Sequence, residues 1–244
     1  DVRSGIREID ALISEINAMA KRINRYDADQ KAFFQNASHE LRTPLMSIQG
    51  YAECIAGGVF EDDKEAAGII VSESERLSRR ISTIISLSRL DDPAAKRQRT
   101  PVRLSDALTK CTRRVEGQAL ERKLEIAVEN GAADEVVPDA ELFDLALENV
   151  LSNAVRHADK RVEICVQAQD AFVRVTVKDD GPGFAPEDLP HIFERFYKGK
   201  SGGSGLGLSI AKTAATNMGG SIQARNENGA AVTLSLPRAR ETSP

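Results

Sequence analysis

The sequence predicts a multidomain α and α+β protein, in which a helical hairpin that dimerises as a four-helix bundle precedes an α/β sandwich domain. The first supporting observation is that apolar residues recur at steps of three and four through about the first ninety residues. The second is the loss of this period at residues 93–101, a segment with a proline at each end. The third is the pattern after Val102, where helical periods alternate with strands in which every second residue is apolar.

Residues 1–30 are predicted to form a coiled-coil helix, because apolar side chains occupy the a and d positions of successive heptads. The seam weakens near Gln30 and then continues, with Phe34 and Leu41 at a positions and Ala37 at a d position. We therefore expect one long helix that runs into the next segment of the chain.

A second helix is predicted after a glycine stop. Gly57 and Gly58 end the first helix, and the acidic residues 61–63 suit the first turn of the next one. Helical spacing then continues to about Leu90, so residues 31–92 are predicted to form a hairpin. Because a hairpin alone leaves an apolar face exposed, we expect two chains to pair as a homodimer.

Residues 93–101 are predicted to be a linker, residues 102–238 a domain of one sheet with helices on it, and residues 239–244 a C-terminal tail. Within the domain, helices are expected over 104–119, 139–157 and about 206–218, and strands over 124–128, 162–169, 173–177, 221–226 and 231–236.

The composition argues against several classes of protein. With 41% hydrophobic and 29% charged residues, the 244-residue chain has a globular rather than a disordered composition. A net charge of −4 argues against nucleic-acid binding through a basic field. The cysteines (Cys54, Cys111 and Cys165) are too far apart for a zinc site and favour a reducing compartment. No run approaches the ~18 apolar residues of a membrane span, so we expect a cytoplasmic fragment, linked to a membrane only through an absent N-terminal region.

Two asparagines share a face of the predicted helix over 139–157. Asn149 and Asn153 lie four residues apart, and Arg156 and His157 follow them. Amide oxygens are hard, neutral ligands that suit Mg²⁺ beside phosphate oxygens. Alone, this is a weak signal, because two asparagines on a helix are usually solvated.

Two glycine-rich segments are candidate ligand-binding segments: residues 179–183, which follow a predicted strand, and residues 202–208, at the predicted helix start near residue 206. In the first, Asp179 ends a strand, where a carboxylate can accept a hydrogen bond from an exocyclic amine, and Gly181 and Gly183 allow close approach to the backbone. A plain turn is the commoner explanation of such a segment. The second, residues 202–208, offers backbone amides as a phosphate cradle, but it lacks the preceding strand of a dinucleotide fingerprint and the lysine of a P-loop.

The helical part contributes His39, followed by Glu40. On the heptad defined above, His39 takes an f position and points away from the bundle core. Pro44 loosens the helix by removing one backbone hydrogen bond. A lone exposed histidine says little, but an outward imidazole beside a carboxylate is a nucleophile with a group that can orient it.

In this order and spacing, the clusters resemble the sensor histidine kinases of two-component signalling. Residues 31–92 resemble the dimerisation and histidine-phosphotransfer domain, with an H-box from Phe33 to Leu45. Residues 102–238 resemble the GHKL-type catalytic ATP-binding domain (Bergerat fold), with its N, G1, F and G2 boxes, the F-box at 193–196. Residues 1–30 resemble the coiled-coil signalling helix, such as the end of a HAMP-type linker, that precedes the H-box.

The resemblance implies a role for each candidate residue. His39 would be the phospho-acceptor, Glu40 would accept its proton, and Thr43 would position water in a phosphatase reaction on the regulator. Asn153, with help from Asn149, would ligate Mg²⁺, and Asp179 would read the adenine amine. The implied ATP-binding residues are Asn149, Asn153, Arg156, His157, Asp179, Gly181, Gly183, Lys198 (or Lys200) as lid cation, Gly203, Gly205, Leu206 and Gly207.

The implied activity is ATP-dependent autophosphorylation of His39, followed by transfer to an aspartate on the receiver domain of a response regulator. The implied setting is a membrane-anchored bacterial sensor that acts as a homodimer. One departure from the family is visible: only six residues separate Phe196 from Gly203, which makes the ATP lid shorter than in many relatives.

Two alternatives stay open at this point. A GHKL ATPase without histidine phosphorylation would use a glutamate at the start of the N-box to activate water, where this chain has Asn149; Glu148 faces about 100° away around the helix. An inactive dimeric scaffold would be expected to have lost His39, Asn153 or Asp179, and all three are present.

Overall fold

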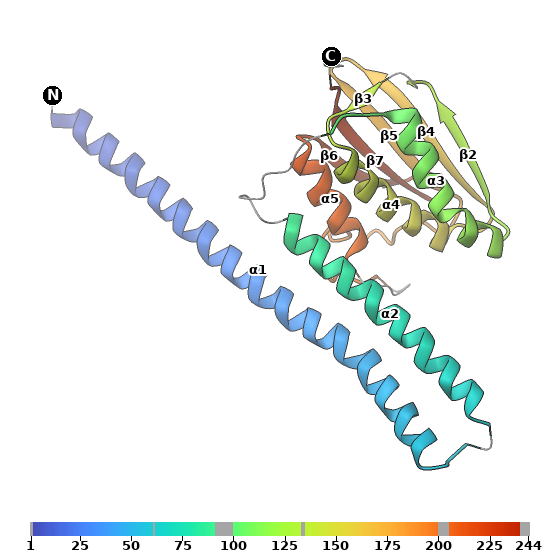
Figure 1. The fold of residues 1–244 in the computed structure, drawn as a ribbon. Helices are drawn as coiled ribbons and strands as arrows, with labels where there is room; N and C mark the ends of the chain where they lie inside the picture. Colours follow the sequence, from blue (N-terminus) through green and yellow to red (C-terminus); the bar gives the residue numbers. More distant parts are fainter. Residues whose placement is uncertain (1, 61, 91–99, 133–134, 200–204, 240–244) are drawn as a thin grey trace. The chain divides into compact units, whose positions relative to one another are not determined.

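The computed structural model describes residues 2–60, 62–90, 100–132, 135–199 and 205–239 (Figure 1). The chain divides into two compact units, Asp1–Ser82 and Thr83–Pro244. None of the helices in these described ranges is both long and apolar enough to cross a bilayer. The predicted linker lies almost entirely outside the described residues, as does most of the predicted tail.

The first unit contains helix α1 (Val2–Ala56) and most of helix α2 (Asp63–Leu90). The predicted glycine stop is confirmed: Gly58 adopts φ +66°, a left-handed conformation that a residue without Cβ adopts easily, and Val59 donates to the carbonyl of Cys54 at 3.0 Å. Asp63 and Glu65 lie in the first turn of α2, where negative charge favours the helix dipole.

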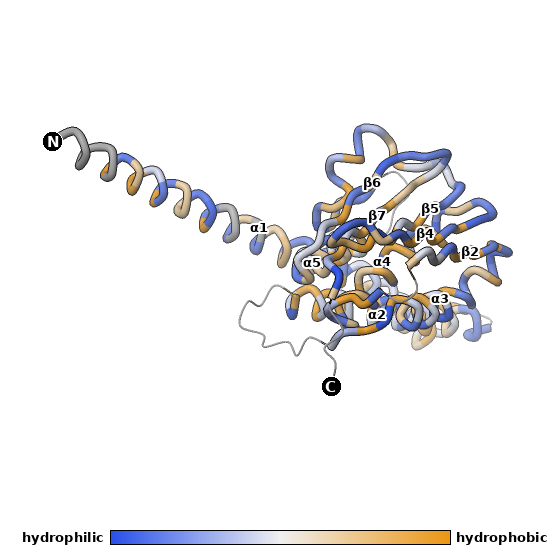
Figure 2. Tube along the Cα trace, turned by 90° about the horizontal axis from the view of Figure 1, so that it is seen from above, coloured by the Kyte–Doolittle hydropathy of each residue, from blue (hydrophilic) through white to orange (hydrophobic). Residues whose placement is uncertain are grey.

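Within a single chain, the buried face of α1 includes Ala37, as its predicted d position requires, but Phe33 in place of Phe34. Phe33 and Ala37 are buried, whereas Phe34 is 61% exposed and Leu41 is only half-buried. Two adjacent phenylalanines both satisfy a period of three and four, so the sequence pattern does not select between them. Figure 2 shows how apolar and polar positions alternate along α1.

The second unit is built on a five-stranded sheet of order β2-β4-β5-β7-β6, in which β2 is parallel to β4 and the other pairs are antiparallel. All five strands were predicted, to within three residues at each end. They are β2 (Glu125–Asn130), β4 (Arg161–Gln169), β5 (Phe172–Asp179), β6 (Ser221–Asn226) and β7 (Ala230–Pro237). A separate antiparallel pair, β1 (Val102–Arg103) and β3 (Val136–Val137), was not predicted, because two residues are too few to show a period.

Three helices cover one face of this sheet: α3 (Leu104–Glu121), α4 (Ala140–His157) and α5 (Gly207–Asn217) (Figure 1). Helix α4 is central, and its Phe143, Leu147 and Leu151 are fully buried. Each such side chain contributes about 1.5–3 kcal/mol through removal of apolar surface from water. The predicted cap of this helix is confirmed, since Asp139 accepts from the N–H of Leu142 at 3.1 Å.

Candidate functional site

Helix α4 carries the two asparagines singled out from the sequence. Asn149 is half-buried, and its Nδ2 donates to the carbonyl of Leu145 at 2.7 Å, which leaves Oδ1 for other contacts. A Cβ added at Gly207 would lie 3.2 Å from that Oδ1, so Asn149 lies against the first residue of α5. Asn153, one turn later on α4, is also half-buried. The structure therefore brings the asparagine helix and the start of the glycine-led helix together.

The carbonyls at the end of α4 are held by a residue that sequence analysis missed. The guanidinium of Arg122, at the C-cap of α3, donates to the carbonyls of Val155, Arg156 and Ala158, the last at 3.1 Å. The last four carbonyls of a helix have no partner within the helix, so an outside donor stabilises this end. No local signal could reveal this contact, because its partners are 33 to 36 residues apart in sequence.

The amides that follow α4 are held by Asp180. Its Oδ1 accepts the N–H groups of Asp159, Lys160 and Arg161 at 2.9, 3.0 and 3.0 Å. Burial acts to raise the pKa of Asp180, but the hydrogen bonds from these three amides outweigh it, and the pKa lies below its ordinary value. Arg122 thus holds the carbonyls before the turn between α4 and β4, and Asp180 holds the amides after it. These contacts also fix the position of His157 at the end of α4.

Asp179 ends β5 and is almost fully buried, with 6% of its surface exposed. Its Oδ1 accepts from the N–H groups of Gly181 at 3.1 Å and Ala230 at 3.3 Å, and Oδ2 accepts no hydrogen bond from the part of the chain that the structure describes. Burial raises the pKa of this carboxyl, while the two backbone bonds and nearby His157 act to lower it. A fixed, buried carboxylate whose Oδ1 carries both backbone hydrogen bonds can use its Oδ2 to accept a hydrogen bond from a ligand amine.

His157 lies within electrostatic reach of Asp179. Burial lowers the pKa of His157, the charge of Arg156 lowers it further, and Asp179 opposes both. The uncharged imidazole is therefore favoured in the folded protein.

The glycines of the segment after Asp179 are needed by the protein itself. A Cβ at Gly181 would collide with the carbonyl of His157. Gly183 adopts φ +74°, and a Cβ there would lie 2.8 Å from Oδ1 of Asn226, which accepts from the N–H of Phe184. Close approach of backbone was predicted, but in the structure the approaching group is another part of the chain, which leaves the predicted role toward a ligand untested.

The glycine-led segment before α5 is partly described. Gly203 lies outside the described residues. Gly205 adopts φ +67°, and its carbonyl accepts from the N–H of Phe196 at 2.7 Å, so the backbone of Phe196 lies against the start of this segment. Leu206 is buried, and α5 begins at Gly207.

The residues next to Phe196 are anchored by Tyr197, a role that was not predicted. Its hydroxyl donates to Oδ1 of Asp188 at 2.7 Å, and its ring stacks on His191 with centroids 5.4 Å apart. Phe193 is half-buried, whereas Lys198 is exposed. Lys200, the alternative lid cation, lies outside the described residues.

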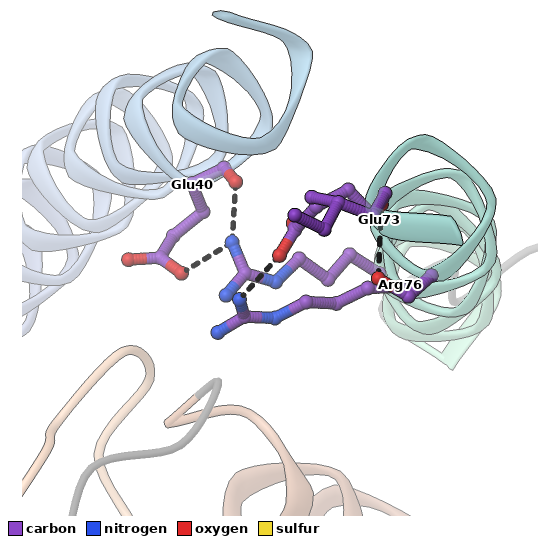
Figure 3. A network of polar contacts seen from close by, with 6 residues as sticks. Glu40, Glu73 and Arg76 are labelled. Carbon is purple, nitrogen blue, oxygen red and sulfur yellow. Dashed lines mark hydrogen bonds and ion pairs between the residues drawn. The ribbon is translucent and has the colours of Figure 1, made fainter. Parts of the chain in front are cut away.

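In the first unit, His39 is exposed on α1, as its predicted heptad position requires. Glu40 does not face the same way: its Oε2 lies 3.1 Å from Nη1 of Arg80 on α2 (Figure 3). The hydroxyl of Thr43 donates to the carbonyl of His39 at 3.3 Å, one turn back along the helix. The ion pair of Glu40 was not predicted, because it joins residues 40 positions apart.

Comparison with known proteins gives two family matches. Residues 29–93 match the His Kinase A (phospho-acceptor) domain, and residues 138–240 match the histidine kinase-, DNA gyrase B- and HSP90-like ATPase. A sensor histidine kinase of Bacillus subtilis, CssS, is 32% identical over 95% of this chain and 52% of its own length. The histidine-protein kinase AfsQ2 of Streptomyces coelicolor is 32% identical over 96% of this chain and 48% of its own length. The chain thus spans about half the length of the curated relatives it matches.

Solved structures agree with these matches. Histidine kinase AdeS of Acinetobacter baumannii superposes with a TM-score of 0.71 over 83% of this chain and 98% of its own, at 23% identity, which shows a shared fold. Full-length ShkA, solved in complex with AMPPNP, is 28% identical and superposes with a TM-score of 0.63 over 86% of this chain and 46% of its own. Histidine kinase ThkA, in complex with the response regulator TrrA, has a TM-score of 0.69 at 22% identity over 84% of this chain and 61% of its own.

Proposed function

Because this chain belongs to the two-component sensor histidine kinases, we propose that it autophosphorylates at His39 from ATP and passes the phosphoryl group to an aspartate on the receiver domain of a response regulator. The observation that carries the proposal is the pairing of two sites in one chain. An exposed imidazole, followed in the sequence by a glutamate, lies in a phospho-acceptor domain, and a buried, fixed carboxylate lies in an ATPase domain. We also propose that the functional boundaries follow the predicted ones, with residues 1–30 as signalling helix, 31–92 as phosphotransfer domain, 93–101 as linker and 102–238 as catalytic domain.

Nucleotide binding is assigned to α4, the end of β5 and the start of α5. Oδ2 of Asp179 would accept a hydrogen bond from the adenine amine. The backbone around Gly203, Gly205, Leu206 and Gly207 would surround the phosphates, since amides at the start of a helix favour anions. Gly181 and Gly183 would line the base, Arg156 and Lys198 would supply positive charge, and His157 would lie against the nucleotide.

Mg²⁺ is assigned to Asn153, with Asn149 in support. The residues fit the ion, because each can offer a hard amide oxygen, and the hydrogen bond from Nδ2 of Asn149 leaves its Oδ1 available. The ion would neutralise charge on the transferring phosphoryl group.

The reaction at His39 requires a nucleophile, an acceptor for its proton and an in-line leaving group. One imidazole nitrogen attacks the γ-phosphorus of ATP, the bond to the bridging oxygen breaks, and ADP leaves with the electron pair. The proton on the other imidazole nitrogen passes to the carboxylate of Glu40. The phosphohistidine then donates its phosphoryl group to the regulator aspartate, which regenerates His39.

The ATPase alternative is disfavoured by the surroundings of Glu148. This residue forms an ion pair with Arg114 of α3, and so it faces α3 rather than the nucleotide segments. The N-box position that carries a glutamate in such ATPases is Asn149 here.

Labelling separates the three possible activities. With γ-labelled ATP and Mg²⁺, the kinase gives label on the protein that is stable to alkali, labile to acid and absent from the His39→Gln variant. Free phosphate without labelled protein would instead indicate an ATPase, and neither product would indicate a scaffold. An Asp179→Asn variant should lose nucleotide affinity and labelling together.

Homodimerisation through the hairpin is proposed from the apolar residues that a single chain leaves uncovered. Large side chains on α1, including Ile16, Phe34, Leu45 and Met46, are 55% to 64% exposed. Pairing of two hairpins would bury them. Light scattering of the purified chain should give twice the monomer mass, and a Phe34→Glu variant should shift it toward monomer.

Phosphatase activity toward the regulator is proposed for Thr43, whose hydroxyl lies one helical turn from His39. A Thr43→Ala protein should still become phosphorylated but should dephosphorylate the regulator more slowly. Unchanged dephosphorylation would remove this role.

A further inference from the structure

Pro44 creates an unusual acceptor on α1. The helix runs without interruption from Val2 to Ala56, and Pro44 lies inside it and is buried. Because proline has no N–H, the carbonyl of the residue four positions earlier receives no helical hydrogen bond. That residue is Glu40, so the freed carbonyl belongs to the same residue whose carboxylate stands next to the phospho-acceptor in sequence.

Arg80 of α2 supplies the missing donor. Its Nη1 donates to the freed carbonyl of Glu40 at 2.5 Å and lies 3.1 Å from Oε2 of the same residue. One nitrogen of the guanidinium thus binds both acceptors of Glu40, one on the backbone and one on the side chain.

The surroundings of this contact distinguish it from the other ion pairs of α2. The side chains of Arg80 and Glu40 are 14% and 22% exposed, so solvent screens their attraction little. Glu73 and Arg76, which Figure 3 shows beside it, form an ion pair within α2, in which Nη1 of Arg76 lies 3.2 Å from Oε1 of Glu73. Arg79, one residue before Arg80, is 70% exposed and lies 3.6 Å from Glu75 of its own helix. Among these pairs, the one made by Arg80 connects the two helices.

We propose that Arg80 is a positioning residue for phosphorylation of His39: it holds Glu40 through its carboxylate and through the carbonyl that Pro44 frees. The contact with the carbonyl fixes the backbone turn that carries His39, and the contact with the carboxylate fixes where the Glu40 side chain stands relative to that turn. A displacement of α2 against α1 would move both groups of Glu40 together, which makes the rate of phosphorylation depend on the packing of the hairpin. This inference rests on the proposed kinase function.

The first test compares three variants of the full chain in the labelling reaction. Arg80→Met removes both contacts while keeping side-chain length, and it should lower the maximal rate of autophosphorylation by about 10- to 100-fold, because a misplaced reacting group costs that much. The KM for ATP should stay within about twofold, since Arg80 is assigned no contact with nucleotide. Arg80→Lys places a charged nitrogen with three donors near both acceptors and should recover most of the rate. The control Arg79→Met removes a neighbouring charge of α2 and should leave the rate unchanged.

A second measurement tests the role of Pro44 without relying on activity. Pro44→Ala restores an N–H that can bond to the carbonyl of Glu40 within the helix. In the wild-type background, Arg80→Met removes the donor that binds the carbonyl of Glu40, and no N–H of residue 44 can replace it. Amide hydrogen exchange over residues 38–48 should then speed up by about tenfold, as expected for loss of a hydrogen bond from a charged donor. In the Pro44→Ala background the helix supplies its own N–H, so Arg80→Met should speed up exchange over the same residues by less than about threefold.

Several results would overturn the inference. The inference fails if Arg80→Met labels as fast as the wild type or faster, if it raises the KM for ATP as much as it lowers the rate, or if Arg79→Met is as slow as Arg80→Met. Equal acceleration of exchange in both backgrounds would show that the freed carbonyl is not what Arg80 binds. If the wild type itself took up no label, the proposed function would fail instead, and the exchange measurement would still decide whether Arg80 and Pro44 are coupled.

Discussion

Asp180 gives the sharpest prediction about how the nucleotide site is held in place. The change is Asp180→Ala, which removes the oxygen on which the amides of residues 159–161 converge at 2.9 to 3.0 Å. Asp180→Asn is the matched control, because its amide oxygen can replace Oδ1 as the acceptor. The neighbouring Asp179 keeps its own bonds to Gly181 and Ala230 in both variants.

The magnitude follows from the exposure of the group. A hydrogen bond to a charged acceptor contributes about 1.5–3 kcal/mol when buried, but Asp180 is exposed, and water can take over part of each lost bond. We therefore count each of the three amides at roughly 0.5–1 kcal/mol, which gives about 2 kcal/mol for local opening of the turn. Since 1.4 kcal/mol corresponds to a factor of ten, exchange of these amides should speed up by about 30-fold.

Residue-resolved amide hydrogen exchange of the full chain measures this directly at residues 159–161. Nucleotide affinity should fall in parallel, because the same turn fixes His157 and the last turn of α4. Asp180→Asn should retain most of the protection and most of the affinity. The reasoning would be refuted if Asp180→Ala left exchange at these residues unchanged, or if Asp180→Asn lost as much protection as Asp180→Ala.

Three other outcomes are expected. Asp139→Ala should lower the free energy of unfolding by about 1–2 kcal/mol in urea titrations, because it leaves the buried N–H of Leu142 without its cap, whereas Asp139→Asn should cost little. Burial and the nearby carboxylate of Asp144 raise the pKa of Cys111 to about 12, so at pH 8 Ellman's reagent should titrate this thiol only after unfolding; rapid reaction of all three cysteines in the native chain would contradict this. The pKa of His157 is lowered in the folded state, so the unfolded chain takes up a proton first as the pH falls below the ordinary value of 6.5; the thermal midpoint should therefore drop between pH 7 and pH 5, and less so in His157→Gln.

Helix and strand boundaries were largely predictable because they depend on signals that lie next to each other in the chain. Gly57 and Gly58 stop α1, Asp139 caps α4, and alternation of apolar residues marks β4 and β5. The departures occur where such signals are absent or ambiguous. Strands β1 and β3 have two residues each, and a period of three and four fits either Phe33 or Phe34 as the buried residue.

The sequence named the residues of the candidate site but not the groups that support them. Residue type and spacing singled out Asp179 and the asparagines of α4 only weakly, and the family resemblance gave them their expected roles. The groups that hold them, Arg122 and Asp180, resemble ordinary surface charges in the sequence. Their partners lie on other elements, and only the packing of α3, α4 and β5 brings them within reach.

By itself, the sequence determined where the helices and strands lie and which side chains can carry phosphoryl chemistry, since periodicity and residue type are local properties. Only the tertiary structure decided how those side chains are oriented, because orientation depends on contacts between segments 20 to 40 residues apart. Arg80 shows the difference most clearly. The position of Pro44 in the sequence shows that the carbonyl of Glu40 cannot form the usual hydrogen bond within the helix. That α2 supplies another donor, Arg80, is known only from the folded hairpin.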